Sequence, residues 1–267
     1  MLAGVIGWPV KHSLSPKIHM AAATAVGVDL RYDAIEVEPG RALDALESMR
    51  LHEIRGYSVT MPHKEAVIAG LDELTASASS LNAVNHITNT DGHLVGNNTD
   101  GDGFVLGLEH ASDFRVHGSV VGVIGSGGAA RAIVEACYRH GAEKVVVVAR
   151  SQERGEIAAA LAQERGITGM ESALGACDIV VNATPVGMAE TAQADSVPFD
   201  VDLLSASTLV VDIVYNPRQT LLLTSAAKRG LPTVEGLTML VGQAAEQFSA
   251  WTGVEAPVEA MYAAVLD

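Results

Sequence analysis

The chain has 267 residues, of which 17 are basic and 32 acidic, so its formal net charge is −15. Apolar residues make up 48% of it, which excludes a disordered chain. No apolar run is long enough for a membrane-spanning helix, and the first residues lack the pattern of a signal peptide. The acidic balance argues against nucleic acid and anionic membranes as partners, because both require clustered Lys and Arg. Two cysteines, Cys137 and Cys177, are too few for a disulfide framework and predict reduced thiols in the cytoplasm.

Strand-like and helix-like runs alternate along the chain, which is typical of an α/β protein. For the first hundred residues, the pattern predicts strands at 2–6, 32–37 and 56–60, helices at 16–26, 42–49, 64–71 and 74–81, and a hairpin at 83–96. The Asp91-Gly92 pair is a strong signal for the turn of that hairpin. Residues 97–101 have the composition of a loop.

The pattern changes after residue 102. It predicts a helix at 102–109, strands at 120–124, 144–149, 179–182 and 209–214, and helices at 219–228, 239–252 and 257–266. We therefore expect a second domain at about 102–235. The last helices could complete that domain or return to the first one.

A glycine-rich turn predicts a dinucleotide site. Residues 125–130 read Gly-Ser-Gly-Gly-Ala-Ala, follow an apolar strand and open a helix. Small residues there let the backbone approach a pyrophosphate, and the free N–H groups of the helix N-terminus bind it.

The residue after the next strand indicates which dinucleotide binds. A site for NAD has an acid at that point, whereas this strand ends in Ala149-Arg150-Ser151, and Arg154 follows one helical turn later. A guanidinium can bind a 2′-phosphate through two hydrogen bonds, so we expect the cofactor to be NADP. The alternative is that Arg150 is merely a solvated residue.

The first domain has two further polar segments. Ser13 and Ser15 precede Pro16, which suits the first position of a helix, so Ser15 is expected to be the N-cap. Two hydroxyls at a helix N-terminus would also suit a small carboxylate. Lys64 is expected in the first turn of a helix, where acids are favoured, so it invites a functional explanation such as proton donation.

Asp100 and Asn85 are the remaining candidates in this region. Asp100 lies in the expected loop, where its role could simply be to form an Asn-rich turn. Alternatively, it is a carboxylate in a cleft, where it would favour the charged form of Lys64. Asn85 lies on a half-buried strand face and requires a partner, from either the protein or a ligand.

Taken together, these segments resemble the shikimate dehydrogenase family over nearly the whole chain. The matching segments are 7–9, 13–16, 58–64, 83–85, 96–101, 125–129, 181–185, 212–217, 235–237 and 239–244. Each segment is modest evidence, but their order and spacing together are specific to this family.

The resemblance implies an α/β protein with a substrate-binding domain at 1–101 and 236–267 and a Rossmann-type NADP-binding domain at 102–235. It implies reversible reduction of 3-dehydroshikimate to shikimate by NADPH, in aromatic amino-acid biosynthesis. Lys64 would be the acid/base group, with Asp100 beside it.

The resemblance also assigns the remaining site residues. The implied substrate ligands are Ser13 and Ser15 for the carboxylate, Thr60, Asn85, Asp100 and Gln243 for ring hydroxyls, and Tyr215 at the border of the substrate. The implied cofactor ligands are Gly125, Ser126, Gly127, Gly128 and Ala129 for the pyrophosphate, Arg150 and Arg154 for the 2′-phosphate, and Ile213, Gly236 and Met239 near the nicotinamide. Ala149 and Thr184 are also expected at the cofactor.

The chain departs from the family at Ala149, where relatives often carry Asn before the cofactor arginine. This removes one contact to the adenosine phosphate without creating an NAD site.

The open alternatives are a quinate/shikimate or aminoshikimate dehydrogenase on the same scaffold, methylenetetrahydrofolate dehydrogenase, and a non-catalytic NADP-binding protein. The scattered histidines predict no metal site. The sequence fits a monomer or a homodimer.

Overall fold

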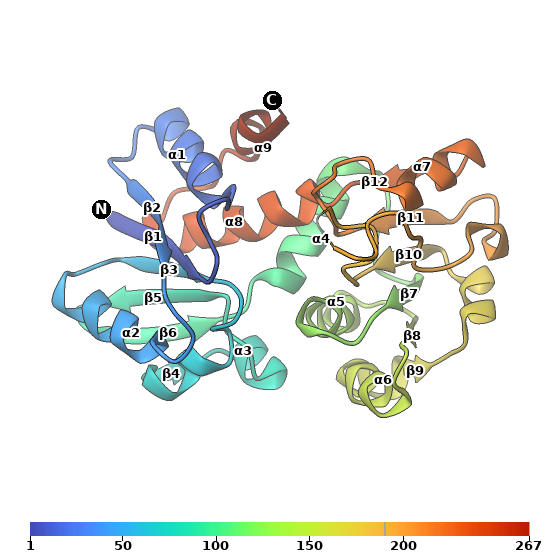
Figure 1. Cartoon of the computed structure of the whole chain (residues 1–267), viewed down its shortest axis with the longest axis horizontal. Helices are drawn as coiled ribbons and strands as arrows, with labels where there is room; N and C mark the ends of the chain where they lie inside the picture. Colours follow the sequence, from blue (N-terminus) through green and yellow to red (C-terminus); the bar gives the residue numbers. More distant parts are fainter. Residues whose placement is uncertain (190, 267) are drawn as a thin grey trace. The chain divides into compact units, whose positions relative to one another are not determined.

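The computed structural model describes residues 1–189 and 191–266. The chain forms two compact units (Figure 1). Unit 1 contains residues 1–99 and the chain from Val241 onward, and unit 2 contains residues 100–240. The chain therefore leaves unit 1, builds unit 2 and returns.

Unit 1 contains a mixed six-stranded sheet in the order β2-β1-β3-β5-β6-β4. Its strands are β1 (Leu2–Gly7), β2 (Arg31–Glu36), β3 (Gly56–Val59), β4 (Glu73–Leu74), β5 (His86–Thr90) and β6 (His93–Asn97). The first three strands pair in parallel, and β5 runs antiparallel to both β3 and β6. The predicted hairpin is confirmed, because Asp91 and Gly92 both adopt positive φ angles between β5 and β6.

Helices cover this sheet. They are α1 (Ser15–Val26), α2 (Ala42–Leu51), α3 (Ala76–Leu81) and the part of α8 (Leu237–Thr252) that begins at Val241, and α9 (Val258–Leu266) packs against α1. A core that includes Ile6, Leu46, Val59 and Ile87 fills the space between sheet and helices. These apolar residues recur at strand and helix spacing, which is why the pattern predicted the elements.

Unit 2 contains a parallel six-stranded sheet in the order β12-β11-β10-β7-β8-β9. Its strands are β7 (Val120–Ile124), β8 (Lys144–Val148), β9 (Gly166–Thr168), β10 (Ile179–Asn182), β11 (Leu209–Asp212) and β12 (Thr233–Val234). Its helices are α4 (Asp100–Ala111), α5 (Gly128–Arg139), α6 (Gln152–Ala159) and α7 (Leu221–Lys228). The sheet reverses its winding at β7, the strand order of a Rossmann fold. The expected α/β class is thus confirmed.

Three local predictions at candidate site residues are wrong. The N-cap of α1 is Leu14 in a helical conformation, so Ser15 is already the first helical residue. The segment predicted as a helix from Lys64 is a turn followed by a short 3₁₀ helix at Ala66–Gly70, so Lys64 precedes the helix. Asp100 begins α4 and is not in a loop. In each case tertiary packing decides a boundary that local preferences leave open.

Both cysteines are free and buried. Burial raises the pKa of the Cys137 thiol to about 12 and that of Cys177 to about 11, so neither forms a reactive thiolate near neutral pH. In the described part of the chain, no helix combines the length and the apolar character that crossing a bilayer requires.

Candidate active site

The start of α1 brings the two predicted serines together. The backbone N–H of Ser15 donates to the Oγ of Ser13 at 3.2 Å. Ser15 is buried, and its hydroxyl is hydrogen-bonded to that of Tyr32 on β2. The first turn of α1 contains no acidic residue that would oppose an anion at the positive end of the helix. This helix end can therefore hold a carboxylate.

A buried hydrogen-bond network leads from Ser15 into the unit. Tyr32 lies 2.6 Å from the Oγ of Ser58 on β3, and Ser58 donates to Oε1 of Gln247 on α8. The Nε2 of Gln247 donates to Oε1 of Gln243, one turn earlier, at 2.7 Å. Burial raises the pKa of Tyr32 well above its usual value, so the phenol stays protonated.

Asn85 joins the same network. Its Oδ1 accepts from the backbone N–H of Thr99 at 2.8 Å and from the hydroxyl of Thr99 at 3.2 Å. Gln247 in turn donates to that hydroxyl oxygen at 3.1 Å. The partner that the polarity of Asn85 requires is thus provided by the protein through Oδ1.

The network connects four of the predicted substrate ligands, namely Ser13, Ser15, Asn85 and Gln243. Sequence reasoning missed the other four members, which are Tyr32, Ser58, Thr99 and Gln247. A signal for Gln247 exists, because it follows Gln243 by four residues in a predicted helix and must share its face. Tyr32, Ser58 and Thr99 give no such signal, since only the folded sheet brings them together.

Lys64 and Thr60 lie on the segment that follows β3. The backbone carbonyl of Lys64 accepts from the N–H of Val84 at 2.8 Å, which anchors this turn next to Asn85. The N–H of Thr60 donates to the carbonyl of Ile6 at the end of β1. Lys64 is half-buried. Asp100 is buried at the start of α4 and directly follows Thr99 in the chain.

In unit 2 the glycine-rich turn joins β7 to α5, as the sequence predicts. Gly125 has a φ of 120°, and a Cβ there would lie 2.9 Å from the carbonyl oxygen of Ala183, so this position requires glycine. A Cβ at Gly127 or Gly128 would meet only open space, so packing does not explain these two glycines. No side chain caps the N-terminus of α5. The turn therefore fits a pyrophosphate, with Ser126 and Ala129 completing it.

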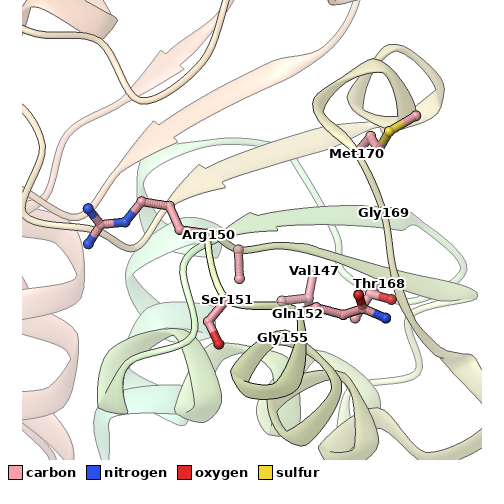
Figure 2. Close-up of a pocket in the computed structure, with 9 residues that line it drawn as sticks. Val147, Arg150, Ser151, Gln152, Gly155, Thr168, Gly169 and Met170 are labelled. Atoms are coloured by element: carbon pink, nitrogen blue, oxygen red, sulfur yellow. The ribbon is translucent and has the colours of Figure 1, made fainter.

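A pocket of about 330 Å³ opens beyond the end of β8 (Figure 2). It is lined by Val147 of β8, by the segment 149–152, by Gly155 of α6 and by residues 168–170 at the end of β9. The Arg150 side chain extends from its rim and away from Thr168 (Figure 2). Within residues 1–189 and 191–266, neither Arg150 nor Arg154 forms an ion pair, so both exposed guanidinium groups are available to a phosphate.

The residues that were assigned to the nicotinamide end lie at or beyond the carboxyl ends of β10, β11 and β12. The Thr184 hydroxyl donates to Oδ1 of Asn182 at 2.6 Å. A Cβ at Gly236 would lie 2.5 Å from the backbone of Ile213, so Gly236 allows close packing there. Met239 packs into the core of unit 2, and Tyr215 is 39% exposed.

Across the described residues, no cluster of three or more His, Cys, Asp or Glu side chains could hold a metal ion.

Comparisons with known proteins identify the family. Three family models match the chain: the shikimate dehydrogenase substrate binding domain at residues 5–87, shikimate / quinate 5-dehydrogenase at 109–221, and the shikimate 5'-dehydrogenase C-terminal domain at 236–266. The NADP(+) shikimate dehydrogenase of Symbiobacterium thermophilum is 41% identical over 99% of this chain and 93% of its own length.

Solved structures agree with these matches. The shikimate 5-dehydrogenase of Thermus thermophilus in complex with NADP(H) and shikimate superposes with a TM-score of 0.91 at 32% identity, covering 99% of this chain and 98% of its own. The quinate dehydrogenase of Corynebacterium glutamicum in complex with NAD superposes with a TM-score of 0.91 at 32% identity, covering 100% of this chain and 98% of its own. The segments quoted from the sequence therefore carried a correct resemblance, and the chain belongs to the shikimate dehydrogenase family.

Proposed function

We propose that the protein catalyses the reversible, NADP-dependent interconversion of 3-dehydroshikimate and shikimate. The observation that carries this proposal is the buried network of unit 1, which joins two serines at a helix N-terminus to the amides of Asn85 and Gln243. A substrate with a carboxylate at one end and several hydroxyls on its ring matches such a lining. We propose that residues 1–101 and 236–267 form the substrate-binding domain.

In this proposal Ser13 and Ser15 bind the carboxylate of the substrate. Ser13 accepts the N–H of Ser15 and retains its own hydroxyl proton for a bound oxygen. The positive end of α1 adds a favourable electrostatic contribution of roughly 0.3–1 kcal/mol. The ring hydroxyls would lie toward Thr60, Asn85, Gln243 and Asp100, and Tyr215 would border the ring.

Lys64 is proposed to be the proton donor to the substrate carbonyl. As the carbonyl is reduced, its oxygen becomes an alkoxide, and a nearby ammonium both stabilises that charge and delivers the proton. The turn that carries Lys64 is anchored to Val84, next to Asn85, and Asp100 follows the threonine that binds Asn85. Asp100 would accept a hydrogen bond from the ammonium and orient it.

NADP is proposed to bind at residues 102–235, where it would supply the hydride to the ring. The turn from Gly125 to Ala129 would hold the pyrophosphate. Arg150 and Arg154, with Ala149 beside them, would hold the 2′-phosphate. Thr184, Ile213, Gly236 and Met239 would contact the nicotinamide end.

A steady-state panel tests this function. Shikimate, quinate and aminoshikimate are each offered with NADP and with NAD, and reduced nicotinamide is followed by its absorbance. We expect the highest kcat/KM for shikimate with NADP. A higher value for quinate would assign the sister activity, which the similarity to the Corynebacterium glutamicum enzyme makes the second candidate. If the folded protein binds NADP in calorimetry but turns over none of the substrates, the remaining interpretation is a non-catalytic NADP-binding protein.

The proposed location is the cytoplasm, which is the compartment that two free, buried thiols fit.

A further inference from the structure

The buried network of unit 1 has a single consistent arrangement of protons, because backbone groups fix it. The backbone N–H of Thr99 can only donate, so the atom of Asn85 that it contacts at 2.8 Å is the oxygen. The Thr99 hydroxyl has one proton, and two acceptors lie near it, Oδ1 of Asn85 at 3.2 Å and the backbone carbonyl of Gln243 at 3.3 Å. That proton is therefore committed to these acceptors.

This commitment orients Gln247. The Thr99 hydroxyl can only accept from the amide of Gln247, so the atom that lies 3.1 Å from it is the nitrogen. The same nitrogen lies 3.4 Å from the backbone carbonyl of Asn85, which also can only accept. Two independent contacts thus place the NH₂ group of Gln247 on this side.

The orientation of Gln247 then fixes that of Gln243. The nitrogen of Gln247 donates to the side-chain oxygen of Gln243 at 2.7 Å. The NH₂ group of Gln243 is consequently turned away from Gln247. If Gln243 turned over, two NH₂ groups would face each other, and fully buried Gln247 would lose its shortest hydrogen bond through Nε2.

The other end of Gln247 is equally constrained. Its oxygen accepts from Ser58, which uses the only hydroxyl proton of Ser58. Tyr32 must then donate to Ser58 across their 2.6 Å contact and accept from Ser15. The side-chain oxygen of Gln247 is therefore the acceptor at the end of the hydrogen-bond chain that begins at Ser15. Its side-chain nitrogen is the donor to Gln243.

We propose that Gln247 is a specificity-determining residue, because it makes Gln243 present a hydrogen-bond donor to the substrate. This inference rests on the proposed function, in which Gln243 binds a ring substituent. A hydroxyl or carbonyl oxygen accepts from an NH₂ group, whereas a protonated amino group cannot. Gln247 thus favours an oxygen substituent over an ammonium without touching the substrate itself.

The variant Gln247→Glu tests this role, because it replaces the donating NH₂ group by oxygen at nearly constant shape. An ionised carboxylate can only accept, so in that state we expect the NH₂ group of Gln243 to turn toward it and the oxygen of Gln243 to turn toward the substrate. The substrates are shikimate and the analogues in which each ring hydroxyl in turn is replaced by an amino group, aminoshikimate among them. We expect the ratio of kcat/KM for shikimate over one of these analogues to fall at least about tenfold, while the KM for NADP stays unchanged.

Two control variants distinguish an effect on the hydrogen-bond orientation of Gln243 from a general loss of stability. Tyr32→Phe removes a hydrogen bond from the same network but leaves Gln247 bound to Thr99, so the ratio should stay within about twofold of wild type. Glu246→Gln changes the neighbouring, exposed residue of α8 and should have no effect on the ratio. If Gln247→Glu does not fold, as judged by circular dichroism, Gln247→Met removes the donor that contacts the side-chain oxygen of Gln243 and should also lower the ratio.

The outcomes are distinct. Equal losses for all substrates, with an unchanged ratio in the folded variants, would overturn the role of Gln247 while the wild-type activity stands. A wild-type protein that oxidises neither shikimate nor any analogue would instead overturn the proposed function.

Discussion

Asn182 donates from Nδ2 to Oδ1 of Asp212 across 2.9 Å and so joins the carboxyl ends of the neighbouring strands β10 and β11. The same carboxylate accepts from the N–H of Val214 at 3.0 Å and from the hydroxyl of Thr220 at 2.7 Å. The side-chain oxygen of Asn182 in turn accepts from the N–H of Thr184. This pair therefore holds the two segments that leave the sheet toward the proposed nicotinamide end.

Asp212→Ala should destabilise the protein strongly. Burial raises the pKa of Asp212, while hydrogen bonds from Thr220, Val214 and Asn182 oppose that shift. Removing the carboxylate leaves these buried donors without their acceptor, so we expect the free energy of unfolding to fall by at least about 2 kcal/mol in urea titrations. The exposed Asp195→Ala loses the same charge and should change it by less than about 0.5 kcal/mol. Equal effects of the two variants would contradict this account.

Lys64→Ala should remove proton donation while leaving the cofactor site intact. We expect kcat to fall by about 100-fold or more, with little change in the dissociation constant of NADP measured by fluorescence. Lys228→Ala, at the exposed end of α7, is the control for the loss of one positive charge and should retain wild-type turnover. Turnover of the Lys64 variant near that of the control would exclude Lys64 from the mechanism.

The sequence predicts best those features of the fold that depend only on a few neighbouring residues. The turn at Asp91-Gly92 and the glycine-rich turn after β7 both require backbone conformations that few residues adopt, and both are found where expected. Regular apolar spacing likewise predicted the longer strands of both sheets and most of the helices, but it missed the short strands β4, β9 and β12 and the helix α6.

The sequence could not predict features that depend on distant partners. Ser15 has the preferences of an N-cap, but its hydroxyl is hydrogen-bonded to Tyr32 on a neighbouring strand, and Leu14 takes the cap position. Asp100 lies among turn-forming residues, yet it begins α4, where a Cβ at Gly101 would lie 2.5 Å from the carbonyl oxygen of Ala132 on α5. Tertiary contacts override local preference in both cases.

Arg150→Ala should weaken NADP binding selectively. Its guanidinium extends from the pocket rim after β8, and no acid takes the position that binds the 2′-hydroxyl of NAD. Loss of charge-assisted hydrogen bonds to a phosphate should raise the KM for NADP by roughly 10- to 100-fold. The KM for NAD, measured in parallel, is the internal control and should change little. If both constants rise equally, Arg150 has no role at the 2′-phosphate.

His19 and His86 should make the protein sensitive to acid. Burial lowers the pKa of His19 to about 3, with a smaller contribution from His86, and burial lowers the pKa of His86 to about 4. Both imidazoles are therefore neutral in the folded state, whereas in the unfolded chain they bind protons below about pH 6.5. The stability that they contribute is complete above that pH and is lost as the pH falls toward 4 for His86 and toward 3 for His19.

The variant His19→Phe tests the contribution of the proton that His19 binds on unfolding. His19 stacks on Tyr32 with ring centroids 4.2 Å apart, and neither of its ring nitrogens has a partner among the described residues, so a phenyl ring can replace it. Between pH 6 and 4.5, urea titrations should show a stability loss that is smaller than in wild type by up to about 1.4 kcal/mol per pH unit. His52→Phe changes an exposed imidazole and should keep the wild-type slope. An unchanged slope for His19→Phe would mean that His19 takes up a proton equally in the folded and unfolded states.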